Sequence, residues 1–354
     1  MSILAIVGAG LMGTATAWPL SDNGHQVRLV GTHLDTEIIQ SCKENHYHPR
    51  LKRKLPEGVQ PYFIDEIGEA LRDAEIIISG VSSPGAHWIG RVIATHLQPG
   101  QKIIAVTKGL EATPDGELRL LPDVLYSELP TGLRDQVSLA AIGGPCIAGE
   151  LAGRRPTHVV FASRSAESVD ALAQAFRTPY YRVRTTTDLL SLELSAALKN
   201  AYTLGVGLAA GLMEQAGGPD ETGMIMDNLA SALFAQGTLE IYHWLEVMGA
   251  DPSFAHHLPG VGDLFVTVQG GRTVRLGRLL GMGKSFAEAR QIMAGETLES
   301  AEIVAQIGIA LPQMQARGQI TPTDFPLLRL LVDLVVNGRR AGLPIERYLS
   351  ILTV

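Results

Sequence analysis

The chain has 354 residues, 46% of them hydrophobic and 18% charged, so its length and composition predict two folded domains and exclude a disordered chain. The formal net charge of -7 provides no general attraction for nucleic acid or anionic lipid, and we expect neither as a partner. Cys42 and Cys146 have no metal-binding spacing, and the N-terminus shows no signal-peptide pattern. We therefore expect a cytoplasmic protein without a metal site or an integral membrane segment.

The N-terminal thirty residues predict a β-α-β unit. An apolar run at Ile3–Val7 is followed by GAGLMG (Gly8–Gly13), a helical pattern over Thr14–Leu20 and a second apolar run at Val27–Val30. A glycine-rich surface turn is the alternative, but it does not explain the two flanking strands. In a dinucleotide-binding loop, Gly8 makes the tight turn, Gly10 lets a pyrophosphate approach the backbone and Gly13 lets the helix pack on the strand.

The choice between NAD and NADP stays open at this stage. An acid that holds the ribose hydroxyl is expected at the end of the second strand, but Asp35 comes late and no arginine replaces it there. The basic loop His48–Pro56 follows, and taken alone it predicts a solvated surface loop.

Strands continue to alternate with helices, which predicts an α/β Rossmann-type, doubly wound parallel sheet. The expected strands are Glu75–Ser79, Lys102–Val106, Val137–Ile142 and His158–Ala162. Ligands bind beyond the carboxyl ends of such strands. Lys108 and the segment Gly144–Ala148 follow two of them, although Lys108 could equally be an ordinary exposed lysine.

A buried helix is predicted over Leu189–Leu212, where Glu193 and Lys199 are the only charged residues. Either charge would cost about 2.5–3.5 kcal/mol at the centre of a membrane, so this helix is not expected to span one. Ser195, Lys199 and Thr203 share one face at four-residue spacing. A lysine among Ala, Leu and Gly requires a partner or a function; a structural ion pair or a lysine whose charged end reaches solvent are the alternatives.

Beyond this helix the sequence predicts an all-α C-terminal domain, with domains at 1–188 and 189–354. The expected helices are Met224–Met248, Phe286–Ala294, Leu298–Ile309 and Phe325–Asn337. Between them, residues 260–275 combine glycines, Asp263, Thr267 and two arginines, a composition that suits anion binding. A helix end followed by a basic helix start is the alternative.

Five motifs in this order and spacing resemble the NAD(P)-dependent sn-glycerol-3-phosphate dehydrogenases along nearly the whole chain. They are GAGLMG (Gly8–Gly13), TKG (Thr107–Gly109), GGPCIAGELA (Gly143–Ala152), ELSAALKN (Glu193–Asn200) and GVGDLFVT (Gly260–Thr267), followed by Arg272. The resemblance implies a Rossmann domain followed by a helical domain, NAD or NADP as cofactor and a small phosphorylated substrate. It also leads us to expect a homodimer.

The resemblance implies Lys199 as the proton acceptor, and Asp263 is expected to orient it through a charge-assisted hydrogen bond. The implied substrate-binding residues are Lys108, Gly144, Asn200, Thr267, Arg272 and Thr273. The implied cofactor-binding residues are Gly8, Gly10, Leu11, Met12, Gly13, Lys108, Ala148, Arg272 and Glu296. Two departures from the family pattern occur: Thr273 stands where the family has Asn, and Ala294-Gly295-Glu296 replaces the family's Glu-Gly.

Two other functions fit part of the pattern. A β-hydroxyacid dehydrogenase or a ketopantoate-type reductase also places a lysine on the first helix after its Rossmann domain. GDLFVT and Arg272 favour a phosphate-bearing substrate instead. A dinucleotide-sensing protein without turnover is disfavoured by the presence of Lys199, Asn200 and Asp263 together.

Overall fold

The computed structural model describes residues 1–342 and 345, which form two compact units. Unit 1 comprises Met1–Lys108 and Leu120–Glu193, and unit 2 comprises Gly109–Arg119 and the chain from Leu194 onward. The last residues of the predicted helical domain, 343–344 and 346–354, lie outside the described residues. In the described part of the chain, none of the helices combines the length and the apolar character that a membrane crossing requires.

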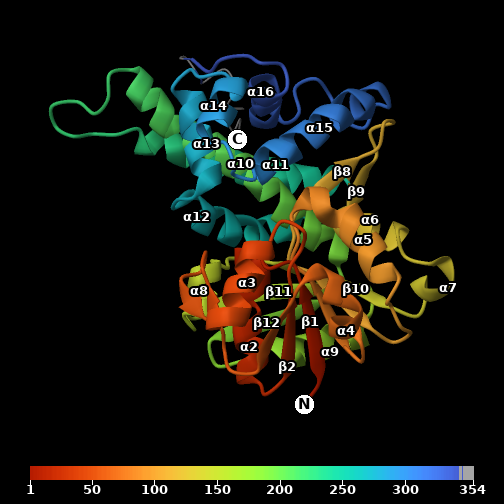
Figure 1. The fold of residues 1–354 in the computed structure, drawn as a ribbon. Helices are drawn as coiled ribbons and strands as arrows, with labels where there is room; N and C mark the ends of the chain where they lie inside the picture. Colours follow the sequence, from red (N-terminus) through yellow and green to blue (C-terminus); the bar gives the residue numbers. More distant parts are fainter. Residues whose placement is uncertain (343–344, 346–354) are drawn as a thin grey trace. The chain divides into compact units, whose positions relative to one another are not determined.

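Unit 1 is built on an eight-stranded sheet with helices packed along it (Figure 1). The strand order is β12-β11-β10-β7-β6-β1-β2-β5. In sequence order the strands are β1 (Ile3–Val7), β2 (Gln26–Val30), β5 (Val59–Tyr62), β6 (Ile76–Ser79), β7 (Lys102–Ala105), β10 (Ser138–Gly143), β11 (Thr157–Ser163) and β12 (Tyr181–Thr186). The chain order reverses between β1 and β6, which is where ligands of doubly wound sheets bind.

The sheet is mostly parallel, which confirms the predicted doubly wound Rossmann-type sheet, and it contains one antiparallel pair. β11 runs antiparallel to β10, with Ala140 opposite Ser163, and β12 then pairs parallel to β11. A parallel neighbour requires a long crossover connection, usually a helix on the face of the sheet. The segment between β10 and β11 has only the five-residue helix α8 (Ala148–Ala152), and the chain turns back beside β10.

Both faces of the sheet are buried. Side chains alternate along β1, so Leu4 and Ile6 enter one apolar core while Ala5 and Val7 enter another. The helices of unit 1 are α1 (Leu11–Ala15), α2 (Ala17–Asp22), α3 (Thr36–Asn45), α4 (Ile67–Leu71), α5 (Ala86–Ala94), α6 (Leu121–Ser127), α7 (Thr131–Arg134), α8 and α9 (Ala166–Phe176). Short 3₁₀ turns η1 (Ile64–Glu66) and η2 (Ser83–Gly85) and the hairpin of β3 (Tyr47–His48) and β4 (Arg53–Lys54) complete the unit.

The helix expected over Thr14–Leu20 is two shorter helices, α1 and α2, that meet at Thr16. Pro19 has no N–H to donate to the carbonyl of Ala15, so an unbroken helix would lose a hydrogen bond there. Thr16 Oγ1 instead donates to the carbonyl of Gly13 at 2.6 Å, which closes the first helix.

Unit 2 is helical apart from one hairpin that comes from the first half of the sequence. Its helices are α10 (Leu189–Gln215, which begins in unit 1), α11 (Asp227–Val247), η3 (Pro252–His256), the π-helix η4 (Leu258–Gly262), α12 (Asp263–Val268), α13 (Arg272–Gly281), α14 (Phe286–Ile292), α15 (Glu299–Ala316) and α16 (Pro326–Val335). The hairpin of β8 (Leu110–Ala112) and β9 (Leu118–Leu120) packs on α15, where the backbone N–H of Ala112 donates to Gln306 at 2.7 Å.

Helices α10 and α13 cross with their backbones in contact. A Cβ on Gly211 would lie 2.0 Å from the carbonyl oxygen of Arg278, and one on Gly277 would lie 2.2 Å from that of Leu204. Because real side chains cannot approach so closely, the crossing requires glycine on both helices. This contact fixes the start of α13 relative to Lys199 on α10.

A second constraint on unit 2 is the buried Glu240 of α11. Its carboxylate accepts hydrogen bonds from Tyr202 Oη, Gln236 Nε2 and the backbone N–H groups of Leu327 and Leu328, at 2.8–3.0 Å. The two N–H groups belong to the first turn of α16, where a helix has no internal acceptors for them. Glu240 therefore joins α10, α11 and α16.

Candidate active site

The glycine-rich loop after β1 packs backbone to backbone. Gly8 has φ +115°, and a Cβ there would lie 2.7 Å from the backbone of Gly80. A Cβ on Gly13 would lie 2.6 Å from the carbonyl oxygen of Gly8. Gly80, at the end of β6, completes this contact; sequence analysis missed it because a lone glycine after a strand resembles any turn.

Gly10 differs from its neighbours because the protein itself leaves room beside it. A Cβ on Gly10 would meet only the carbonyl oxygen of Gly80, at 3.7 Å, which is an ordinary contact. Its backbone is therefore open to a ligand. Leu11 is 42% exposed, and Met12 Sδ lies 4.0 Å from Cys146 Sγ, next to the loop that leads into α8 and Ala148.

Asp35 faces the glycine-rich loop. Its Oδ2 accepts hydrogen bonds from the backbone N–H of Ala9 at 3.2 Å, the N–H of Thr32 at 2.9 Å and Thr32 Oγ1 at 2.8 Å. The residue is only 7% exposed. Asp35, the first acid after β2 in the sequence, is thus used within the protein to hold the loop.

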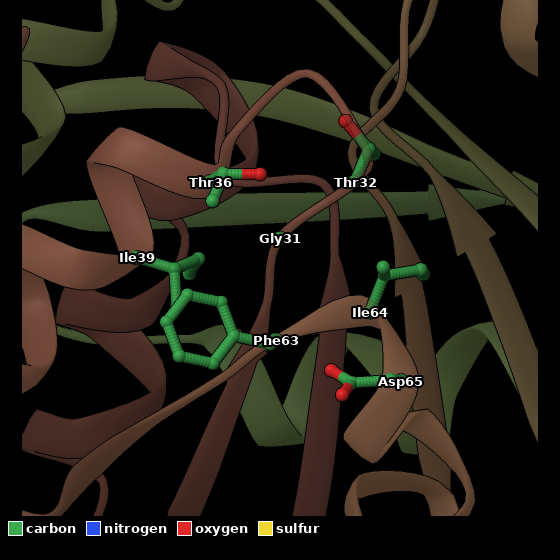
Figure 2. A pocket seen from close by; sticks show the side chains of 7 residues that line it. All are labelled: Gly31, Thr32, Thr36, Ile39, Phe63, Ile64 and Asp65. Atoms are coloured by element: carbon green, nitrogen blue, oxygen red, sulfur yellow. The ribbon is translucent and has the colours of Figure 1, made fainter.

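A cavity of about 290 Å³ lies at the carboxyl end of β2 (Figure 2). Its lining residues are Gly31, Thr32, Thr36, Ile39, Phe63, Ile64 and Asp65. Figure 2 shows the Phe63 ring beside Ile39, with Ile64 and the Asp65 carboxylate across the cavity and two threonine hydroxyls at its rim. The cavity thus combines apolar side chains with two hydroxyl groups and one carboxylate.

Lys108 and Gly144 lie together at the ends of β7 and β10. Lys108 Nζ donates to the carbonyl oxygen of Gly144 at 3.3 Å, and Ser83 Oγ donates to the Lys108 carbonyl at 3.3 Å. Gly144 has φ +121°, a conformation that favours glycine. The structure therefore brings together these two residues, both expected at the substrate site.

Glu193 is a fully buried acid in the first turns of α10. Neither of its carboxylate oxygens has a hydrogen-bond partner among the described residues. Burial raises its pKa to about 8, opposed by the positive charge of Lys108 and reinforced by the negative charge of Asp123. Glu193 is therefore mostly protonated at neutral pH.

Lys199, Asp263 and Thr267 form a largely buried cluster in unit 2, in which Thr267 is half-buried. Lys199 Nζ donates to Asp263 Oδ1 at 2.8 Å and to Thr267 Oγ1 at 2.7 Å. Thr267 Oγ1 in turn donates to the backbone carbonyl of Asp263 at 2.6 Å. The side chains of Lys199 and Asp263 are 6% and 3% exposed.

Local structure explains why these three residues meet. Asp263 and Thr267 are one turn apart on α12 and share a face. The preceding π-helix η4 packs tightly, since a Cβ on Gly260 would lie 2.3 Å from the carbonyl oxygen of Ala255. Thr203, one turn beyond Lys199, donates to the Lys199 carbonyl at 2.8 Å. The amine is thereby held at a defined position beside an acid and a hydroxyl.

The expected anion-binding residues at the start of α13 are ion-paired. Arg272 Nε donates to Glu299 Oε2 at 2.8 Å, with a second contact between Arg272 Nη2 and Glu299 Oε1. Arg275 Nη1 lies 2.9 Å from Glu296 Oε1. Thr273 is buried beside them, and Asn200, next to Lys199, is half-buried. Sequence analysis missed Glu299, which no spacing rule connects to Arg272.

The Rossmann-type sheet with its glycine-rich loop, together with the buried lysine–aspartate–threonine cluster, defines a dehydrogenase that uses a nicotinamide dinucleotide. Two family models match the chain: NAD-dependent glycerol-3-phosphate dehydrogenase N-terminus over residues 3–169 and the C-terminus of the same enzyme over residues 188–342. The chain belongs to this NAD-dependent glycerol-3-phosphate dehydrogenase family.

Individual relatives agree with the family models. The NADP(+)-dependent glycerol-3-phosphate dehydrogenase of Archaeoglobus fulgidus is 36% identical over 289 residues, 82% of this chain and 83% of that protein. The crystal structure of glycerol-3-phosphate dehydrogenase from Coxiella burnetii has a TM-score of 0.78 and 26% identity over 94% of each chain. A ketopantoate reductase from Ralstonia eutropha, at 15% identity and TM-score 0.56 over 95% of this chain and 97% of its own, shares the fold alone.

Proposed function

We propose that this chain interconverts sn-glycerol 3-phosphate and dihydroxyacetone phosphate with NAD or NADP. The observation that carries the proposal is the buried Lys199–Asp263–Thr267 cluster, because it presents an amine held for proton transfer within motifs that match the family. Family membership over most of the chain supports the same reaction.

The residues present fit a dinucleotide. Gly10 leaves its backbone open, and the packing of Gly8 and Gly13 keeps the loop close to the ends of β1 and β6. We assign the pyrophosphate to residues 8–13, including Leu11 and Met12, with Lys108 and Ala148 as further contacts. The Figure 2 cavity, at the end of β2, is assigned to the adenosine end. The bound nicotinamide supplies the hydride chemistry.

Lys199 acts as the general acid and base. In the direction of oxidation its neutral amine accepts the proton of the C2 hydroxyl, and in the direction of reduction its ammonium donates a proton to the ketone oxygen. Asp263 orients the amine through a hydrogen bond, and Thr267 fixes the direction of a second N–H. Burial of the cluster excludes water from this step.

The substrate phosphate requires local positive charge in a chain of net charge -7. We assign this charge to Arg272 and Lys108, with Asn200, Gly144, Thr267 and Thr273 as neutral contacts to the phosphate. The planar guanidinium group of Arg272 suits a phosphate. Glu299 holds this group in place until the phosphate of the substrate competes for it. Arg272 and Glu296 are also assigned to the cofactor, on the family resemblance.

The assignment of roles to domains follows. Residues 1–188 supply most of the dinucleotide-binding groups, and residues 189–354 supply the catalytic and most substrate-binding groups. A cytoplasmic location, a homodimer and the absence of a nucleic-acid partner are further parts of the proposal, and the acidic net charge supports the last of them. Light scattering on the purified protein tests the dimer.

The decisive experiment is a substrate panel. NADH and NADPH oxidation are measured with dihydroxyacetone phosphate, ketopantoate and short β-keto acids. We expect turnover with dihydroxyacetone phosphate alone. We also expect the kcat/KM values for NADH and NADPH to differ by less than roughly a thousandfold, or about 4 kcal/mol. The reason is that Asp35, the acid expected to select between them, is hydrogen-bonded to the glycine-rich loop. Turnover of ketopantoate but not dihydroxyacetone phosphate would refute the proposal, and binding without turnover of any substrate would indicate a sensor.

A further inference from the structure

A buried histidine connects the basic hairpin β3–β4 to the glycine-rich loop. His48, at the end of β3, is completely buried, and its Nε2 lies 2.9 Å from the carbonyl oxygen of Ala9. Ala9 stands between Gly8 and Gly10. A segment that sequence analysis predicts to be a solvated loop therefore contributes a side chain directly behind the proposed pyrophosphate-binding backbone.

The hydrogen bonds of His48 determine which ring nitrogen carries the proton. The backbone N–H of Leu51 donates to His48 Nδ1 at 3.0 Å, so Nδ1 must present its lone pair. The neutral ring then has its proton on Nε2, which donates to the Ala9 carbonyl. Both nitrogens are matched to their partners only in this neutral tautomer.

The peptide groups of Ala9 are held from two sides. His48 binds the carbonyl oxygen, and Asp35 Oδ2 accepts the N–H at 3.2 Å. Together these bonds fix the peptide groups on both sides of the Ala9 Cα. The Ala9 carbonyl and the Gly10 N–H belong to one planar peptide group, so the direction of the Gly10 N–H is fixed as well. A loop held in its binding conformation loses less entropy when a ligand binds.

We propose that His48 is a positioning residue that sets the affinity for the dinucleotide by holding the glycine-rich loop through its neutral imidazole. The inference rests on the proposed function in one respect, that residues 8–13 bind the cofactor. His48 itself contacts neither the cofactor nor the substrate in this scheme, so it affects binding and leaves proton transfer unchanged.

The proposal predicts a dependence of affinity on pH. Burial is the largest influence on His48 and lowers the pKa of its imidazole below the usual 6.5. The hydrogen bond to the Ala9 carbonyl raises this pKa in part, and of the charged groups that face the ring Arg50 lowers it and Asp35 raises it. At neutral pH the ring is therefore uncharged. Protonation at lower pH places an N–H on Nδ1 opposite the Leu51 N–H, which breaks the match, so the dissociation constant rises as the pH falls through the lowered pKa.

Two substitutions separate the two hydrogen bonds. His48→Gln keeps a donor at the position of Nε2 and cannot titrate, whereas His48→Asn keeps an acceptor near Nδ1 and loses the bond to Ala9. His46→Asn is the matched control, because His46 binds Pro56 O at 3.1 Å near the same hairpin and has a left-handed backbone that asparagine tolerates.

The measurement is the dissociation constant of NADH or NADPH, whichever wild type binds more tightly, by fluorescence titration between pH 5.5 and 7.5 without substrate. At pH 7.5 we expect His48→Asn to weaken binding about tenfold, the loss of roughly one buried hydrogen bond. His48→Gln and His46→Asn stay within about twofold. The loss of affinity at acid pH disappears in His48→Gln, and kcat at saturating cofactor is unchanged in all three variants.

Equal affinity of His48→Asn and wild type at every pH overturns the inference, as does an equal loss of affinity at acid pH in His48→Gln and wild type. The second comparison decides the matter if His48→Asn does not fold. Failure of the proposed function is recognised separately, because wild type would then bind neither dinucleotide.

Discussion

At the scale of single residues, the proposed phosphate-binding role of Arg272 separates the proposed function from that of a ketopantoate-type reductase. Arg272 and Arg275 lie one turn apart on α13, and each is paired with a glutamate. We predict that Arg272→Lys, which keeps the charge and loses the planar fork, raises the KM for dihydroxyacetone phosphate clearly more than Arg275→Lys does. Steady-state kinetics with parallel NADH titrations separates an effect on substrate from one on cofactor.

The outcomes of this comparison differ in meaning. Damage from Arg275→Lys alone would show that Arg275, and not Arg272, binds the phosphate. No effect from either change would place the phosphate site elsewhere and would favour a substrate of the ketopantoate type.

Glu193 leads to a prediction of how the free energy of unfolding depends on pH. Its pKa of about 8 in the folded protein lies above the ordinary 4.5 of an unfolded chain, so between these values the folded state holds a proton that the unfolded state has lost. The contribution of Glu193 to the free energy of unfolding is fully present below its pKa in the unfolded chain, and it is lost as the pH rises toward 8. Glu193→Gln keeps the neutral shape and removes the titration.

We therefore expect the unfolding free energy of Glu193→Gln relative to wild type to increase by roughly 1.4 kcal/mol per pH unit between pH 5.5 and 7.5. Urea denaturation at three pH values measures it. Glu240, whose burial raises its pKa to about 7, titrates in the same window, but it is present in both proteins and cancels in the difference. A difference that does not vary with pH would show that Glu193 is already ionised.

At the scale of elements, the glycine contact between α10 and α13 fixes the position of α13, the helix that begins at Arg272. A Cβ on Gly211 would overlap the Arg278 carbonyl, whereas one on Gly205 of the same helix would lie 3.4 Å from the end of the Leu327 side chain. We predict that Gly211→Ala lowers the unfolding free energy by about 1–3 kcal/mol, as overpacking does. Gly205→Ala is neutral or stabilising by up to about 1 kcal/mol, because alanine favours helix.

Thermal unfolding of the two alanine variants makes this comparison. A melting temperature of Gly211→Ala equal to that of Gly205→Ala would mean that α10 and α13 separate at little cost, and that the contact does not fix α13.

Sequence periodicity predicts most elements of both units because burial decides them locally. The strands of the sheet and the long helix α10 follow from apolar runs, and its end at Gln215 lies one turn beyond the predicted Leu212. The antiparallel β11 and the hairpin that joins unit 2 could not be predicted, because both depend on pairing between distant segments. The helix break at Thr16 could have been found from Pro19.

For the site, the motifs predict which residue types occur but not their partners. The hydrogen bond between Lys199 and Asp263 spans 64 residues and follows from the motif pair only because the family is recognisable. The hydrogen bonds of Asp35 and His48 to the Ala9 backbone have no sequence signature, since a histidine in a basic loop resembles a surface residue. Glu299, the partner of Arg272, escapes detection for the same reason.

At the scale of the whole molecule, the proposed reaction divides between the two units. Unit 1 holds the glycine-rich loop and the cavity at the end of β2, and unit 2 holds Lys199, the amine proposed to move the proton. An enzyme built this way keeps cofactor binding when the amine is removed, because the loop and the amine belong to different units.

The most direct test of this account is the rate of dihydroxyacetone phosphate-dependent NADH or NADPH oxidation by wild type and Lys199→Ala, with cofactor affinity measured in parallel. General acid–base catalysis contributes roughly 10²–10⁴-fold. We predict a loss of kcat in that range, with the dissociation constant of the cofactor changed by less than about threefold. Near-wild-type turnover of Lys199→Ala would contradict the account, because proton transfer would then depend on another group.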